Sequence, residues 1–257
     1  MAAPKNEPKI YVGIVLDFET GGLDCVNSPC TQIAMKAIRL DNWQVLDSYV
    51  SYFRPYNKQD IGGIPKRKVL KDKRQLELEE PSQKMTYDQA ALTYSAITMD
   101  MLIARGIDIK EIGRDIILFA EHCTLSKGKQ TKPVVIGQNV TFDIGFLQQV
   151  MNYAGLVKEF EKTFAGTFDF YGNFQPYYID TLHLGRLCFA ADPAVTSYKL
   201  ELLAERLGVE LSDAHDALSD VDATLEVLAV CGSRLRSSTG SATLLQKQEK
   251  TRAHFKI

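Results

Sequence analysis

The chain has 257 residues, of which 45% are hydrophobic and 24% are charged, and its formal net charge is −2. This balance is typical of a globular protein with a sizeable core, and it excludes nucleic-acid binding through a global positive field, so that any such binding requires local patches. The five cysteines form no CxxC pair and no cluster with histidine, which argues against a zinc site or a disulfide framework and suits the reducing cytoplasm. We expect neither a signal peptide in residues 1–8 nor a membrane span, because no apolar run approaches the roughly 20 residues that crossing a bilayer requires.

The first part of the chain predicts three strands. Residues 10–18 are apolar and β-branched, residues 31–40 alternate between apolar and polar, and residues 43–53 follow the turn signal Asp41-Asn42, which favours a hairpin. The next segment, residues 57–84, is charged and too long for a simple connection, so we interpret it as an insertion.

The remainder predicts helices alternating with short strands. Helices are expected over residues 85–105, 109–123, 140–153, 180–189, 197–207 and 214–230, and strands over residues 133–136 and 177–179. Residues 233–257 are polar and basic and are expected to be a frayed tail. The order predicts an α/β domain over residues 10–232, with a mixed sheet flanked by helices and preceded by a short segment, residues 1–9.

Asp17 and Glu19 are the first candidates for chemistry. They lie two positions apart at the end of the first strand, so their carboxylates point to the same face of the sheet. A fixed pair of carboxylates suits a divalent cation, which prefers several oxygen ligands. The alternative is a turn that carries two solvated acids.

Asn139 and Asp143 mark a second place, where a strand meets a helix. Asn139 has the alternative role of a helix N-cap. Asp143 follows one helical turn later beside apolar residues, where a carboxylate needs a cation or a hydrogen-bond donor because burying it alone is costly.

His215 and Asp220 mark a third place, at the start of the last helix. Histidine titrates near neutral pH and is the most common general base, although a lone histidine is more often a surface residue. At about 100° per residue, Asp222 falls nearer to His215 than Asp220 does, so the spacing alone leaves both acids open as partners.

Together these segments resemble the motifs of the DnaQ-like (DEDDh) 3′–5′ exonuclease family, which includes the exonuclease domain of the DNA polymerase III epsilon subunit. Residues 14–23 (IVLDFETGGL) resemble the first motif, residues 137–143 (GQNVTFD) the second, and residues 215–220 (HDALSD) the third. Gln138 departs from the histidine that the family often has at that position. Residues 179–181 and 197–200 fit as supporting stretches, so the resemblance covers about residues 10–230.

The resemblance implies a ribonuclease H-like fold and a two-metal mechanism. It assigns Asp17, Glu19, Asp143 and Asp220 as ligands of two Mg²⁺ or Mn²⁺ ions, assigns His215 as the general base, and prefers Asp220 to Asp222. It also implies a nucleic acid 3′ end as the substrate, with single-stranded DNA favoured and RNA as the alternative, and a DNA polymerase as a candidate partner.

Residues next to the acids are candidates for substrate binding. They are Phe18, Thr20, Gly21, Leu23 and Asn139. Phe18 and Leu23 could stack or wedge against terminal bases, whereas the alternative for Phe18 is packing in the core. The basic run in the 57–84 insertion could contact phosphates or be a solvated loop. A non-catalytic, polymerase-associated binding module remains the alternative to an enzyme.

Overall fold

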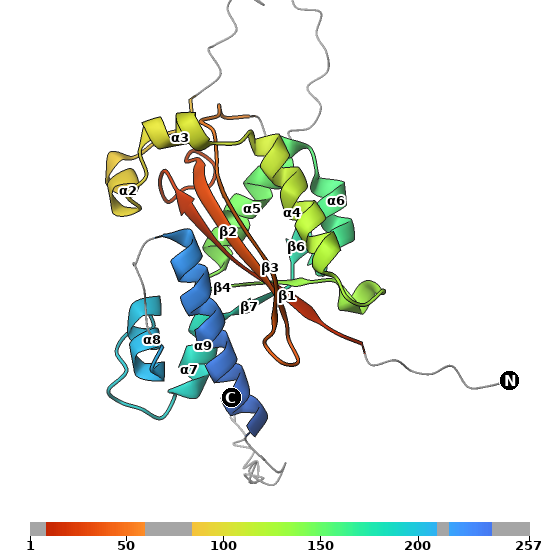
Figure 1. The fold of residues 1–257 in the computed structure, drawn as a ribbon, viewed down its shortest axis with the longest axis vertical. Helices are drawn as coiled ribbons and strands as arrows, with labels where there is room; N and C mark the ends of the chain where they lie inside the picture. Colours follow the sequence, from red (N-terminus) through yellow and green to blue (C-terminus); the bar gives the residue numbers. More distant parts are fainter. Residues whose placement is uncertain (1–8, 60–83, 210–215, 238–257) are drawn as a thin grey trace, which may run out of the picture.

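The structure, a computed structural model, describes residues 9–59, 84–209 and 216–237 (Figure 1). The predicted mixed sheet is confirmed, with five strands in the order β3-β2-β1-β4-β7. The antiparallel part is β1, β2 and β3, and β4 and β7 continue the sheet parallel to β1. The strands are β1 (Val12–Thr20), β2 (Cys30–Arg39), β3 (Val45–Tyr52), β4 (Val134–Gly137) and β7 (Tyr178–Asp180).

The central strand, β1, is apolar because helices cover both of its faces. Ile14 and Leu16 belong to a large core that includes residues of α4 (Ile109–Cys123) and α5 (Thr141–Ala154). Val15, which points to the opposite face, packs in a second core with residues of α9 (Ala217–Ser237). The two-residue period of the strand therefore divides β1 between two cores.

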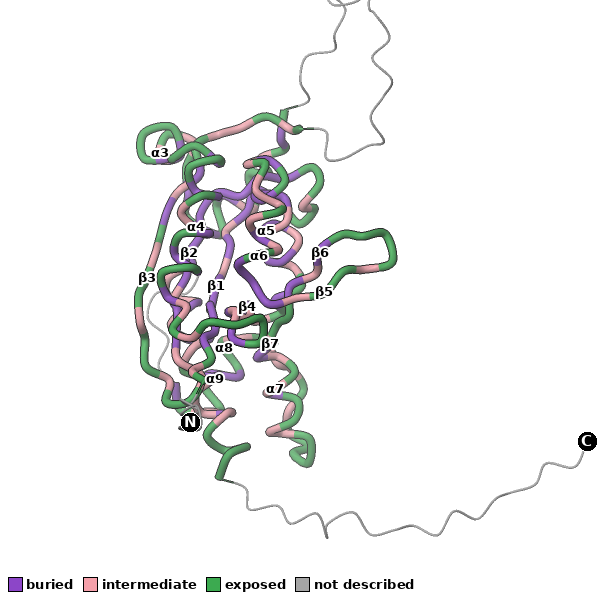
Figure 2. The backbone as a smooth tube through the Cα atoms, turned by 90° about the vertical axis from the view of Figure 1, so that its right-hand side faces the viewer, coloured by how far each residue is buried: buried purple, intermediate pink, exposed green. Residues whose placement is uncertain are grey.

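The helices form two groups, which Figure 1 shows on opposite sides of the sheet. One group contains α4, α5 and α6 (Val157–Thr163), and the other contains α7 (Thr181–Cys188), α8 (Leu200–Leu207) and α9. In Figure 2 the buried residues follow β1, β2 and the inner sides of α4 and α5. Within the part of the chain that the structure describes, no helix is long and apolar enough to cross a membrane.

The prediction of one helix over residues 85–105 is wrong. The segment forms two short helices, α2 (Gln89–Tyr94) and α3 (Met99–Arg105), separated by a turn in which Ala96 adopts φ 53°. The Thr98 hydroxyl then accepts a hydrogen bond from the backbone N–H of Met101 and caps α3. A side-chain cap of this kind offers the backbone an alternative to continuing the preceding helix.

Other differences concern short elements. The sequence analysis missed α6, the 3₁₀ helix at Lys129–Thr131, and the hairpin of β5 (Gly166–Phe168) and β6 (Phe174–Pro176), which projects from the domain in Figure 2. The final helix extends to Ser237, so the first residues of the expected frayed tail are helical. A bridge between Asn57 and Lys84 joins the two ends of the expected insertion, whose residues 60–83 lie outside the described part of the chain.

Candidate active site

Asp17 and Glu19 extend the face of β1 that carries Val15. Val15 packs with Ala217 and Val221 of α9, so the two carboxylates that follow it along the strand are directed toward the start of the same helix. The pairing of β1 with β2 shifts register between Glu19 and Thr20. Such bulges bend a strand where its regular pairing ends, and here the bend lies beside the two acids.

Asp220 lies in the first turn of α9 and completes a cluster with these two residues. Asp17, Glu19 and Asp220 can each contribute one carboxylate oxygen to a group whose atoms all lie within 4.8 Å of one another. Asp222, which the spacing alone left as an alternative, forms an ion pair with Lys36 of β2. The geometry therefore distinguishes two acids that sequence spacing could not.

Asp143 approaches from a third direction, in the first turn of α5. Its side chain is buried, and its Oδ1 atom accepts a hydrogen bond from the backbone N–H of Phe18 over 3.0 Å. A buried carboxylate requires a hydrogen-bond donor, and here that donor is the N–H of Phe18, which lies between Asp17 and Glu19 in β1. The first and second sequence motifs are joined directly by this bond.

The acids strongly affect each other's protonation. Burial, followed by the charges of Asp143 and Glu19, raises the pKa of Asp17 well above its usual range. Burial and the charges of Asp220 and Asp216 raise the pKa of Glu19 to about 7. Burial raises the pKa of Asp143 to about 8, although the hydrogen bond from Phe18 opposes the shift. Carboxylates held this close favour protons or cations.

The donor set fits hard divalent cations. Oxygen atoms from several carboxylates are the ligands that Mg²⁺ and Mn²⁺ prefer. Between described residues, no ion pair to lysine, arginine or histidine involves Asp17, Glu19 or Asp143. Among the described residues, the negative charge that these three carboxylates carry when ionised is therefore not neutralised by such side chains.

His215, the expected general base, lies outside the described residues, which resume at Asp216. Asp216 is a site residue that the sequence analysis did not single out. Its charge raises the pKa of both Asp17 and Glu19, and its Oδ1 accepts a hydrogen bond from Gln32 Nε2 over 3.1 Å. Its position inside the third motif, next to His215, was the available signal.

A cavity of about 350 Å³ adjoins Glu19 and contains several of the predicted substrate-binding residues. Leu23 lines it and is 89% exposed, whereas Phe18 also lines it but is only 4% exposed and packs against Phe53 in the core. Phe18 thus takes the core-packing alternative. Thr20 lines the cavity too, and its hydroxyl donates to the carbonyl of Gly22. The remaining lining residues are Asp88, Ala91, Tyr94 and Phe142.

Gly21 is not among the lining residues of this cavity. Its backbone N–H donates to the carbonyl of Pro29 over 2.8 Å and its carbonyl accepts from Asp88, so it shapes the loop after β1.

Asn139 lines a second, more open cavity of about 610 Å³. Asn139 adopts φ 55°, a conformation that asparagine tolerates better than most residues, and its N–H donates to Asp180 Oδ1 over 3.0 Å. The N-cap of α5 is Val140, so the capping role that the sequence left open for Asn139 is wrong.

Gln138 helps to form the second cavity. Its amide nitrogen donates to the carbonyl of Tyr198 over 2.7 Å, and its amide oxygen accepts from the Thr181 hydroxyl over 2.6 Å. These bonds fix the segment before α8, and Lys199 of this segment lines the cavity together with Arg186 of α7. The second cavity therefore contains two cations close to the acidic cluster.

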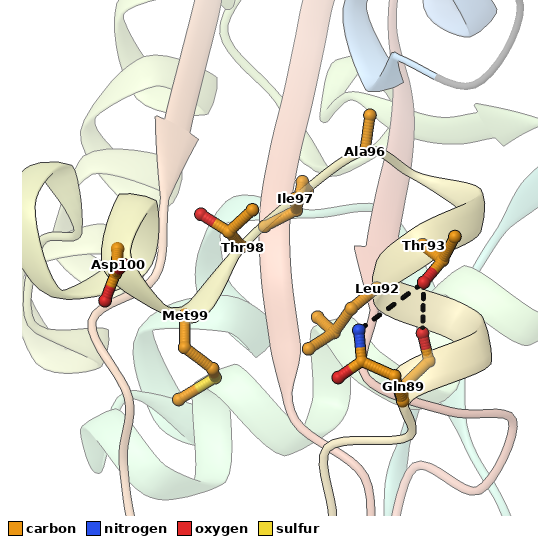
Figure 3. A pocket seen from close by; sticks show the side chains of 8 residues that line it. All are labelled: Gln89, Leu92, Thr93, Ala96, Ile97, Thr98, Met99 and Asp100. Atoms are coloured by element: carbon orange, nitrogen blue, oxygen red, sulfur yellow. Dashed lines mark hydrogen bonds between the residues drawn. The ribbon is translucent and has the colours of Figure 1, made fainter.

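A third cavity, of about 440 Å³, lies at the corner between α2 and α3 (Figure 3). Gln89, Leu92 and Thr93 line it from α2, and Ala96 and Ile97 line it from the turn. None of the predicted site residues lines this cavity. Its position on the other side of α2 separates it from the acidic cluster.

Comparison with known proteins shows which proteins this chain is similar to. The RNase T family model, described as an exonuclease, matches residues 125–228. The PolC-type DNA polymerase III of Pediococcus pentosaceus is 24% identical over 211 residues, and that of Lacticaseibacillus paracasei is 25% identical over 241 residues. The alignments cover 82% and 93% of this chain but only 11% and 12% of those polymerases.

Solved structures share the fold. Exonuclease I of E. coli in complex with a dA16 oligonucleotide matches with a TM-score of 0.59 and 20% identity, over 88% of this chain and 42% of that one. Exonuclease I from Methylocaldum szegediense matches with a TM-score of 0.59 and 21% identity, over 88% of this chain and 41% of that one. The chain thus spans less than half the length of these exonucleases.

The sheet order, the flanking helices and the matching structures define the ribonuclease H-like class of fold. Within that class, residues 125–228 match the RNase T exonuclease family model, and the fold is similar to that of exonuclease I.

Proposed function

We propose that the protein is a metal-dependent 3′–5′ exonuclease that hydrolyses phosphodiester bonds at the 3′ end of DNA. The observation that carries this proposal is the convergence of carboxylates from β1, α5 and α9 beside a cavity large enough for an organic ligand. The match to the RNase T exonuclease family model supports it, and the oligonucleotide complex of the E. coli exonuclease I supports single-stranded DNA as the substrate.

The residues that would hold two Mg²⁺ or Mn²⁺ ions are Asp17, Glu19, Asp143 and Asp220. When bound, such ions lower the pKa of an attacking water and stabilise charge on the phosphate oxygens. The chain's own contribution is to fix the donors. The N–H of Phe18 orients the carboxylate of Asp143, and the strand and α9 hold the other three.

His215 is proposed as the general base. The protein must remove a proton from the attacking water, and an imidazole nitrogen that titrates near neutral pH can accept it. Its place in the third sequence motif, five positions before Asp220, supports this assignment.

RNA trimming by the same residues is the second candidate reaction, and a non-catalytic binding module is the candidate outside the enzymes. The polymerase relatives support a DNA polymerase as a partner, in a proofreading role, and a DNA repair role is the other candidate. The cysteines within the structure are all free, which agrees with a location in the reducing cytoplasm.

The decisive experiment is digestion of 5′-labelled single-stranded DNA and RNA oligonucleotides with Mg²⁺ or Mn²⁺. A ladder that shortens from the 3′ end is expected, and it should disappear in EDTA and in Asp17→Ala. The polymer that is degraded faster identifies the preferred sugar. If neither polymer is shortened, hydrolysis is excluded, and a shift of the oligonucleotide in a binding assay would then favour the binding module.

A further inference from the structure

Gln32 is a buried amide on the face of the sheet that carries the acidic cluster. It lies in β2 directly opposite Glu19 of β1, and only 3% of its surface is exposed. Residues opposite each other in an antiparallel pair point to the same face, so the Gln32 side chain lies on the side of the sheet that Glu19 faces. Ala34, two positions along β2, packs in the core with α9, which Figure 1 shows running along the sheet.

Two hydrogen bonds connect Gln32 to Asp220 through a single residue. The Nε2 atom of Gln32 donates to Oδ1 of Asp216 over 3.1 Å, and the backbone carbonyl of Asp216 accepts from the N–H of Asp220 over 3.0 Å. Asp216 directly precedes α9, so the second bond belongs to the first turn of that helix. These contacts join the strand opposite Glu19 to the helix residue that completes the cluster.

A neutral amide suits this position for an electrostatic reason. A carboxylate only accepts hydrogen bonds, so Gln32 presents its amide nitrogen to Asp216. A lysine or arginine could donate as well, but its positive charge would compete with a cation for the cluster. A glutamate would add a negative charge where burial and the charges of Asp220 and Asp216 already raise the pKa of Glu19. The amide therefore holds Asp216 and leaves the charge of the cluster to a cation.

A second contact between the same strand and helix provides a contrast. Lys36 lies four positions further along β2, on the same face, and pairs with Asp222 of α9. The Asp222 side chain is 47% exposed, and exposed ion pairs contribute little to holding two elements together. Gln32 is buried, where the loss of a hydrogen-bond partner is costly. The Gln32 contact is therefore the stronger constraint on where the first turn of α9 lies.

We propose that Gln32 is a positioning residue: through Asp216 it holds the first turn of α9, and so keeps Asp220 within reach of a bound cation. Gln32 touches neither the substrate nor the cation in this role and acts only through the helix. Its effect on catalysis rests on the proposed exonuclease function. Its effect on cation binding does not require that the protein hydrolyses DNA, so the two can be measured separately.

The test uses substitutions that change the hydrogen bond while nearly keeping the size of the side chain. Gln32→Met removes the donor, and Gln32→Glu replaces it with a charge that repels Asp216. Both variants should bind Mn²⁺ about 10-fold more weakly than the wild type, because the loss of outer-shell support has an effect of this size. Electron paramagnetic resonance of the free Mn²⁺ measures the affinity. For single-stranded DNA, kcat should fall by a similar factor while KM for the DNA stays within about twofold.

A reciprocal exchange separates this role from a general contribution to the fold. When Gln32→Glu is combined with Asp216→Asn, the amide and the carboxylate change places, so that the hydrogen bond and the total charge are both kept. Gln32→Glu should therefore weaken Mn²⁺ binding about 10-fold beside Asp216 but less than about threefold in the Asp216→Asn background. Because both backgrounds carry the same substitution in β2, the difference measures the contact between the two side chains.

Lys36→Met is the matched control, because it removes the other contact between the same face of β2 and the start of α9. It should bind Mn²⁺ and cleave DNA within about twofold of the wild type, since its ion pair is partly exposed. Thermal melts in EDTA identify the variants that are folded at the assay temperature. If Gln32→Met is not folded, the comparison of Gln32→Glu in the two backgrounds decides.

The inference is overturned if Gln32→Glu binds Mn²⁺ as tightly as the wild type, or if it loses as much affinity in the Asp216→Asn background as beside Asp216. Equal losses in Gln32→Met and Lys36→Met would also overturn it. A wild type that binds Mn²⁺ in this Gln32-dependent way without shortening DNA would support the inference and exclude the proposed hydrolysis. A wild type that binds no Mn²⁺ would overturn the inference and the proposed function together.

Discussion

The carboxylate of Asp143 accepts a hydrogen bond over 3.0 Å from the backbone N–H of Phe18, a residue 125 positions earlier in the chain. The bond holds the second motif against the strand that carries Asp17 and Glu19. It also gives the buried acid its donor, although burial still raises the pKa of Asp143 to about 8. Asp143 therefore has a structural role and an electrostatic cost that can be measured separately.

We predict opposite effects for two substitutions of Asp143. In EDTA at pH 9, Asp143→Asn should melt above the wild type, because its amide oxygen can still accept the Phe18 N–H without adding a buried charge. Asp143→Ala should be less stable than Asp143→Asn by about 1–3 kcal/mol, since the donor is left without a partner. Thermal melts of the three proteins measure this order, and equal melting of the two variants would show that the hydrogen bond contributes nothing. Both variants should respond less to Mn²⁺ than the wild type.

Asp220 and Asp222 provide a matched pair on one helix. Asp220→Asn should lower kcat/KM at least about 100-fold, because a ligand that stabilises the transition state is lost, and it should reduce the rise in melting temperature caused by Mn²⁺. Asp222→Asn removes only the partially exposed pair with Lys36 and should cost less than about 1 kcal/mol of stability, with activity within twofold. Equal losses of activity in the two variants would contradict the assignment of Asp220.

The parts of the fold that local sequence determines were predicted well. Helix α4 begins at Ile109 and ends at Cys123 as expected, because its apolar stripe and the Asp108 cap agree. Strand β1 was predicted because an apolar, β-branched run is followed by a glycine pair. The acids Asp17 and Glu19 followed from the two-residue period of that strand.

Features that depend on tertiary contacts were not predicted. No glycine or proline in the sequence marks the break between α2 and α3 at Ala96. The choice between Asp220 and Asp222 required knowledge of where Lys36 lies. Tyr94 and the cations of the larger cavity, Arg186 and Lys199, are far apart in sequence and become neighbours of the site only through the packing of α2, α7 and α8 around the sheet.

Metal-free stability should fall as the pH rises from about 5 to 8. Glu19 and Asp143 have pKa values of about 7 and about 8 in the folded protein, above their ordinary values of 4.5 and 3.8. The folded state therefore binds protons more tightly than the unfolded state. The contribution of these two groups to the stability of the fold is fully present below their pKa values in the unfolded chain. It is lost as the pH rises through their pKa values in the folded protein.

Melting curves in EDTA at pH 5 and pH 8 test this dependence, with Glu19→Gln as the comparison. The variant should lose less stability than the wild type over this range, by about 1–2 kcal/mol once solvent screening of the partly exposed group is allowed for. Mn²⁺ should restore the stability of the wild type at pH 8, because a bound cation replaces the protons in stabilising the carboxylates. A wild type that is equally stable at both pH values, or more stable at pH 8, would contradict the electrostatic cost assigned to the cluster.

His215→Ala should separate proton transfer from metal binding. As the proposed general base, His215 must be neutral, so wild-type kcat should fall below about pH 6.5. The variant should lose about 100- to 10,000-fold in kcat while keeping the rise in melting temperature with Mn²⁺. His122→Ala, on the exposed side of α4, is the control and should behave as the wild type. An unchanged pH profile in His215→Ala would assign the base elsewhere.

Phe18 and Leu23 should differ in what their loss affects, although both were candidates for contact with terminal bases. Phe18 is 4% exposed and packs against Phe53, so Phe18→Ala should destabilise the fold by about 3–5 kcal/mol. Leu23 is 89% exposed in the wall of the cavity, so Leu23→Ala should change stability by less than about 0.5 kcal/mol and instead raise KM. Urea unfolding and steady-state kinetics on the same preparations measure both quantities. A stable Phe18→Ala with a raised KM would reverse the assignment, because a side chain that stacks on substrate need not support the core.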